Sequence, residues 1–171
     1  MKIVLSILMA ISLNACAMNE VSSHGMADSK KIADGMIHVA SQFSVKQTAD
    51  RLETLLKKKG MKVFNRVNHG QGAASVGVKL NPTELVIFGN PKVGSPLMQC
   101  AQTMALDLPQ KALIWQDKNG KVWLSYNDPE YLQKRHKVKG CEMDFANIKK
   151  ALAGLAKAAA VDDLIIQLNG F

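Results

Sequence analysis

Residues 44–60, S-V-K-Q-T-A-D-R-L-E-T-L-L-K-K-K-G, decide the fold class because they predict a helix whose apolar side must be covered. Ser44 and Gln47 form a capping-box pattern at its start, and Gly60 ends the segment. Apolar residues recur at i, i+4, i+7 and i+11, as on a core-facing helical stripe: Val45, Ala49, Leu52 and Leu56. We therefore expect this helix to pack on a sheet or on other helices.

Strand patterns lie on both sides of this helix. The continuous apolar run at residues 85–88 is typical of a strand buried on both faces. The turn at residues 117–120, D-K-N-G, predicts a hairpin. The strands that we expect are residues 37–40, 61–67, 85–88, 111–116 and 121–126.

Further helices are predicted between and after the strands. Ser95 as N-cap and Pro96 at the first position predict a helix to about residue 106. Residues 70–77 are small and Gly-rich, which fits a loop or a short helix. The last two predicted helices are residues 128–135 and the amphipathic segment 145–159. This order predicts an α+β fold with a largely antiparallel sheet and an added C-terminal helix.

Residues 1–17 have the pattern of an export signal. Lys2 precedes an apolar run at residues 3–13, which suits a signal-peptide core and is shorter than the ~20 residues that span a bilayer as a helix. Ala15-Cys16-Ala17 fits cleavage after an A-x-A site, whereas a lipobox interpretation makes Cys16 the lipidated first residue. Both stay open, and we expect a periplasmic or envelope protein. We expect a tether at residues 18–35, the domain at 36–137 and a helical extension at 138–171.

The composition limits the choice of partners. The formal net charge is +8, but the lysines are dispersed apart from residues 57–59, where cations oppose the helix dipole. Aromatic residues make up 5% of the chain, too few for a base-stacking platform. We therefore expect no nucleic-acid partner, and membrane contact only through a lipid anchor. The sequence leaves a homodimer open.

Two cysteines follow the leader. An oxidising compartment permits a disulfide between Cys100 and Cys141, which would close a loop of about 40 residues and contribute ~3–4 kcal/mol. The alternative is a buried thiol, because Leu97, Cys100, Ala101 and Met104 share one helical face. Both alternatives stay open.

The segment at residues 89–95, G-N-P-K-V-G-S, joins a strand to a helix and comes close to a phosphate-binding loop. It lacks the Lys before the Ser, and Pro91 removes a backbone donor, so nucleotide hydrolysis is excluded. A helix start with a nearby lysine still suits an anion, although a sharp turn explains the same glycines and proline. We expect a ligand site between two Gly-rich loops, with these candidate residues: His69, Asn90, Lys92 and Ser95.

His69 and His136 are the candidate ligands of an alternative haem or transition-metal site. Met98, Cys100 and Met104 cannot all face one ion unless the helix is broken, because their helical spacing directs them apart. A loop hydrogen bond and a helix C-terminus explain the two histidines without a metal. The sequence carries no triad order, zinc-protease motif or paired-cysteine motif, so it favours a non-enzymatic role and indicates no cofactor.

Several motifs occur in the order of a known family: N-H-G at 68–70, P-T-E-L-V-I-F-G-N-P at 82–91, G-S-P-L-M-Q at 94–99, L-D-L-P at 106–109 and Y-N-D-P at 126–129. Over residues 37–136 the chain resembles the bacterial and archaeal family called domain of unknown function 302. The resemblance implies a small α+β domain with a curved antiparallel sheet, similar to the TATA-binding-protein-like fold, and no established activity.

These observations predict an exported, envelope-associated module that binds a small anionic or cofactor-like ligand. The alternative is a haem- or metal-binding redox protein that uses His69 or His136. A third interpretation is a structural or partner-binding domain with its C-terminal helix as the contact surface.

Overall fold

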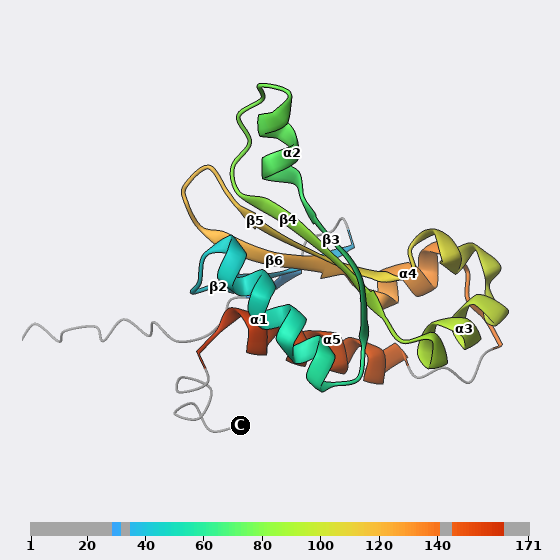
Figure 1. The fold of residues 1–171 in the computed structure, drawn as a ribbon. Helices are drawn as coiled ribbons and strands as arrows, with labels where there is room; N and C mark the ends of the chain where they lie inside the picture. Colours follow the sequence, from blue (N-terminus) through green and yellow to red (C-terminus); the bar gives the residue numbers. More distant parts are fainter. Residues whose placement is uncertain (1–28, 32–34, 141–144, 163–171) are drawn as a thin grey trace, which may run out of the picture.

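A computed structural model describes residues 29–31, 35–140 and 145–162 (Figure 1). The described strands are β1 (Ser29–Lys31), β2 (Met36–Ser41), β3 (Lys62–Asn68), β4 (Thr83–Gly89), β5 (Gln110–Gln116) and β6 (Val122–Asn127). The described helices are α1 (Val45–Lys58), α2 (His69–Ser75), α3 (Pro91–Cys100), the 3₁₀ helix η1 (Gln102–Leu106), α4 (Pro129–Arg135) and α5 (Phe145–Ala160).

The six strands form one sheet in the order β1-β2-β6-β5-β4-β3. All neighbouring strands pair antiparallel, which confirms the predicted α+β class. β5 and β6 form the predicted hairpin, in which Trp115 lies opposite Trp123. β3 and β4 pair with one irregularity, a bulge between Val63 and Asn65.

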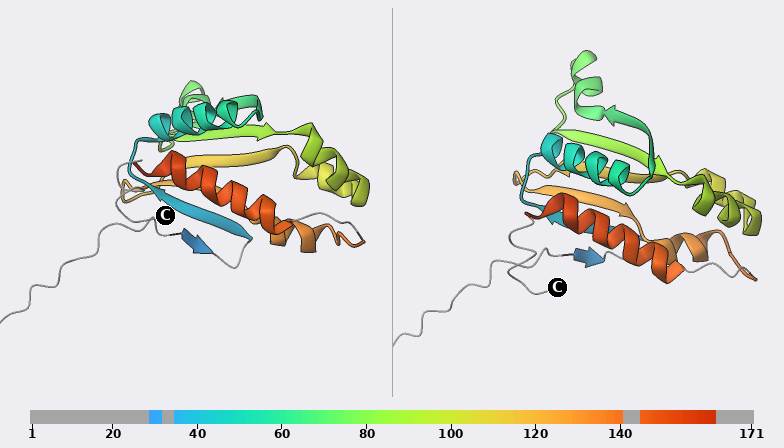
Figure 2. Two further views of the ribbon diagram at one scale, coloured as in Figure 1. Left: turned by 90° about the horizontal axis from the view of Figure 1, so that it is seen from below. Right: turned by 60° about the horizontal axis from the view of Figure 1, so that its bottom comes forward.

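Helix α1 begins where the sequence places it. The Ser44 hydroxyl accepts the Gln47 backbone N–H at 3.2 Å, and the Gln47 side chain accepts the Ser44 N–H at 3.1 Å. Its apolar stripe is buried as predicted: Val45, Ala49, Leu52 and Leu56. α5 lies beside α1 on the same face of the sheet (Figure 2). The apolar side of α5 therefore packs inside the domain, and its buried residues are Leu152, Leu155, Ala156, Ala159 and Ala160.

A smaller apolar cluster lies beyond the end of the sheet. It joins α3, η1, α4 and the start of α5 through Leu97, Met104, Leu132, Val138 and Phe145. Ile148 of α5 packs against both this cluster and the main core. α5 thus connects the two apolar regions of the domain.

The expected cap of the second helix is wrong. Asn90 caps α3, because its side-chain oxygen accepts the Lys92 backbone N–H at 3.0 Å. Pro91 takes the first helical position, where a missing N–H costs nothing, so Ser95 and Pro96 lie inside the helix. The helix ends at Cys100, and η1 follows it where the sequence predicts one continuous helix.

The expectation that the 85–88 strand is buried on both faces is also wrong. Along β4, Val86 and Phe88 are buried against the helices, whereas Leu85 and Ile87 point to the other face and are half-buried. The reason is that α1 and α5 both cover one side of the sheet (Figure 2). The Gly-rich stretch after β3 forms the short helix α2, capped by Asn68.

Candidate functional site

An open cavity of about 440 Å³ lies where the end of β4 meets α3 and α5. Its walls are mainly apolar, and they include Phe64, Phe88, Leu108, Ile148 and Leu152. At about 30 Å³ for each water-sized unit, the cavity has room for roughly fifteen non-hydrogen atoms. An apolar space of this size suits a small ligand with a hydrocarbon part.

Local features of the chain create this cavity. The bulge in β3 places Phe64, which is 44% exposed, at one wall. Asn90 and Pro91 start α3 directly after β4, so the helix forms a second wall instead of covering the strand end. On the remaining side Ile148 and Leu152 extend from α5.

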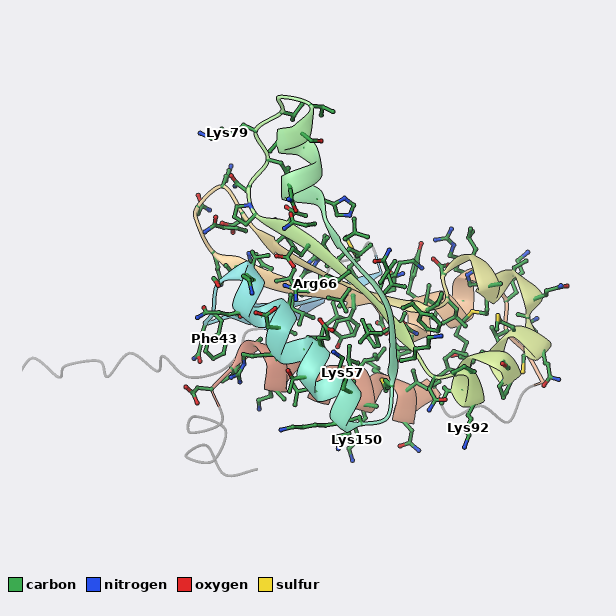
Figure 3. All side chains as sticks on the ribbon, viewed as in Figure 1. Phe43, Lys57, Arg66, Lys79, Lys92 and Lys150 are labelled. Carbon is green, nitrogen blue, oxygen red and sulfur yellow. The ribbon has the colours of Figure 1, made fainter. Side chains whose placement is uncertain are left out.

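Polar and cationic groups lie around these apolar walls. Asn90 and Ser95 of α3 line the cavity. Lys92 is exposed in the first turn of α3, and Lys150 precedes the lining residue Ala151 in α5; both lysines extend from the same side of the molecule (Figure 3). The start of α3 can therefore attract an anionic group while the cavity holds an apolar one.

His69 does not belong to this cavity. His69 begins α2, directly after the end of β3 at which Asn68 pairs with Glu84. The cavity lies at the other end of β3, where Lys62 pairs with the lining residue Gly89. The six residue steps along β3 separate the two ends by roughly 20 Å. Of the four predicted ligand residues, the structure brings together Asn90, Lys92 and Ser95 in α3 and its cap, and places His69 at the opposite end of the strand.

His136 follows α4, and both of its ring nitrogens have partners. Nε2 lies 2.6 Å from Asp107 Oδ2, and Nδ1 lies 3.0 Å from the Thr103 hydroxyl. Arg135 Nε approaches the same carboxylate at 3.5 Å. These contacts connect the end of α4 to η1. Within the described ranges, no group of three His, Cys, Asp or Glu side chains could hold a metal ion.

An ion-pair network on the helix-covered side joins β3 to α1. Arg66 contacts Glu84 and Asp50, each at 2.6 Å, and Glu53 at 3.6 Å. Hydrogen bonds from Lys46 and then Arg66 lower the pKa of the Asp50 carboxyl. The network fixes the edge strand on α1, a role of Arg66 that no local sequence pattern indicates.

Tyr126 contributes a buried phenol to the core. It is 5% exposed, and its hydroxyl has no hydrogen-bond partner within the described part of the chain. Burial, with the nearby Asp128 carboxylate as a smaller cause, raises the pKa of Tyr126 to about 12.

The other face of the sheet carries a polar contact among aromatic rings. His38 Nδ1 lies 2.7 Å from the Ser125 hydroxyl, and Trp115 Nε1 donates to the same oxygen at 2.8 Å. The sequence alone does not indicate this cluster, because His38 and Ser125 are 87 residues apart and only strand register aligns them.

Several predictions concern residues outside the described ranges. These are the leader with Cys16, most of the tether, and Cys141 as the predicted partner of Cys100. They stay predictions. Among the described helices, none is long and apolar enough to cross a bilayer.

The chain is similar to longer curated proteins named as ion channels. The chain is 48% identical over 134 residues to the fluoride-specific ion channel FluC 1 of Brucella suis biovar 1 (strain 1330), covering 77% of this chain and 52% of that protein. It has the same identity over the same length to FluC 1 of Brucella abortus biovar 1 (strain 9-941), covering 49% of that protein. The chain thus spans about half the length of the curated relatives that it matches.

A solved structure shares the fold. The crystal structure of the uncharacterized conserved protein DUF302 from Bacillus stearothermophilus superposes with a TM-score of 0.64 at 20% identity, covering 74% of this chain and 99% of that one. The model of the family described as "Domain of unknown function DUF302" matches residues 37–157, which include β2 and most of α5. The chain belongs to the DUF302 family.

Proposed function

We propose that this protein is a binding module of the cell envelope that holds a small anionic amphiphile. The apolar part of the ligand occupies the cavity between α3 and α5, and its anionic group lies at the start of α3 near Lys92. The single observation that supports this most strongly is an apolar cavity of about 440 Å³ beside the start of α3. The first N–H groups of α3 are bonded to Asn90, so the attraction for an anion comes from Lys92 and the helix dipole.

The charge around the cavity favours an anion over a cation. Lys92 and Lys150 flank the lining residues Pro91 and Ala151 in sequence. A neutral amphiphile would gain the apolar contacts but not this attraction.

The cellular location belongs to the same proposal. The signal-like residues 1–17 support export, with either release or lipid attachment at Cys16, and export would permit the Cys100–Cys141 disulfide. The curated relatives, roughly twice as long, are named fluoride-specific ion channels, which supports a role for the shared domain at a membrane. Intact mass of protein from its own host distinguishes the two leader products and detects the disulfide.

Calorimetric titration of the purified protein with dodecanoate, dodecanol and acetate tests the binding function. We expect dodecanoate to bind more tightly than dodecanol, and acetate not to bind measurably, because the apolar chain supplies most of the free energy. Lys92→Gln should weaken dodecanoate and leave dodecanol unchanged. Absence of dodecanoate binding would refute the proposal. A Soret band or stoichiometric metal in the purified protein would instead favour the haem or metal alternative.

A further inference from the structure

We propose that two copies of this chain associate face to face through the side of the sheet that α1 and α5 do not cover. We call this side the open face. Its apolar residues come from four neighbouring strands and include Val67, Leu85, Ile87, Leu113, Trp115 and Trp123. The open face is a different surface from the ligand cavity.

The open face has no cover among the described elements. α1 and α5 both pack on the opposite side (Figure 2). An antiparallel sheet with one free face normally presents polar residues there. Here Leu85, Leu113 and Val67 are aligned in one row by the strand register, and each is half-buried. A continuous apolar surface of this kind marks an interaction site.

Hydrogen bonds within the chain hold the two indole rings of the open face in place. Trp115 Nε1 donates to Ser125 at 2.8 Å, and Trp123 Nε1 donates to Asp117 at 3.0 Å. His38 lies between them, with its ring centroid 6.4 Å from each indole in an edge-on arrangement. Rigid aromatic anchors lose little conformational entropy on association. These bonds therefore prepare the surface for docking.

The size of the open face favours a second copy. With β2, whose His38 lies opposite Ser125, the face spans five strands. Five strands at about 4.8 Å spacing and six residues at about 3.4 Å give roughly 500 Å² for each copy, so a pair buries about 1,000 Å², the lower limit for a specific interface. The central positions carry no carboxylate. Lys111 lies opposite Ile87 towards one end of β5, and the Lys121 ammonium lies over the Trp123 ring, 4.2 Å from its centroid. A twofold axis through such a face lets identical apolar rows pack as an aligned sandwich.

The chain contains two tryptophans, and both lie on the open face. Sedimentation of the purified protein over a range of concentrations should show twice the monomer mass, and acrylamide quenching of tryptophan emission should fall as the dimer forms. Leu113→Glu should raise the dimer dissociation constant by at least about a hundredfold, because each dimer would bury two carboxylates against apolar side chains. The matched control is Val76→Glu, at a position that is 74% exposed after α2, and it should stay dimeric.

Circular dichroism checks that each variant is folded. If Leu113→Glu does not fold, Leu85→Gln serves as a milder change on the same row. A wild-type protein that stays monomeric at the highest soluble concentration overturns the proposal. So does a Leu113→Glu protein that is folded and dimeric. A monomer whose tryptophan emission shifts to the blue only with phosphatidylglycerol vesicles would assign the open face to a membrane and also overturn it. Ala151→Phe in the cavity should leave the mass unchanged, so the two proposals fail independently.

Discussion

Replacing Ala151 by Phe should close much of the ligand cavity with little effect on the rest of the domain. Ala151 lines the cavity from α5 and is itself exposed. Ala153 provides a matched control, because it is an exposed alanine two residues further along the same helix and does not line the cavity. Successive helical positions are 100° apart, so the two side chains point in nearly opposite directions.

The expected loss of affinity follows from the space that the ring takes. The added phenyl group displaces about four methylenes of a bound chain, and each buried methylene contributes about 0.8 kcal/mol. The binding free energy of dodecanoate should therefore fall by about 3 kcal/mol, which is roughly a hundredfold in dissociation constant. Both substitutions carry the same helix-propensity cost, at most about 0.7 kcal/mol, so the unliganded proteins should have similar stability.

Calorimetric titration of wild type, Ala151→Phe and Ala153→Phe with dodecanoate measures this difference directly. We expect wild type and Ala153→Phe to bind alike and Ala151→Phe to bind about a hundredfold more weakly. Thermal unfolding without ligand shows whether the two variants remain comparable. Equal affinity in all three proteins would refute the assignment of the cavity as the binding site. Equal weakening in both variants would show that the loss arises from helix damage.

The remaining predictions concern stability, each measured by urea unfolding. Burial raises the folded-state pKa of Tyr126 to about 12. The free energy of unfolding should therefore fall by about 2–3 kcal/mol as the pH rises from ~10 through 12. Tyr126→Phe should abolish that fall. Arg66→Met should cost about 3 kcal/mol at neutral pH, since it leaves the buried Glu84 unpaired. As the pH falls below ~4, the same variant should lose less unfolding free energy than wild type does, because the pKa of Asp50 is less depressed without Arg66. Ser44→Ala should cost about 1 kcal/mol by removing the capping box.

The elements that the sequence predicts well are those with local causes. The cap at Ser44 and the turn at residues 117–120 depend on neighbours within a few residues, and both occur in the structure. The α3 boundary was missed because the chain offers two cap-and-proline pairs, Asn90-Pro91 and Ser95-Pro96, and local rules do not choose between them. The apolar pattern alone allowed a strand at residues 85–88 that is buried on both faces. In the structure α5 packs beside α1 on one side of the sheet, so only one face of this strand is covered by helices.

The site was only partly predictable for a related reason. The helix start at Asn90 and Lys92 is a local pattern, and the structure places it beside the cavity. The cavity itself needs Phe64, Leu108 and Ile148, which are far apart in sequence and meet only through the fold. His69 follows a Gly-rich pattern equally well, yet the antiparallel pairing of β3 with β4 carries it to the other end of the sheet.

The two edges of the sheet limit how large an assembly can grow. At one edge β1 has three residues, and at the other β3 is interrupted by its bulge and carries the cations Lys62 and Arg66. Short, bulged and charged edges are poor templates for a further strand. Growth by strand addition, which would lead to open-ended fibres, is therefore disfavoured. In the proposed dimer, face-to-face pairing would use up the open face once two molecules have met, so association would stop at two copies.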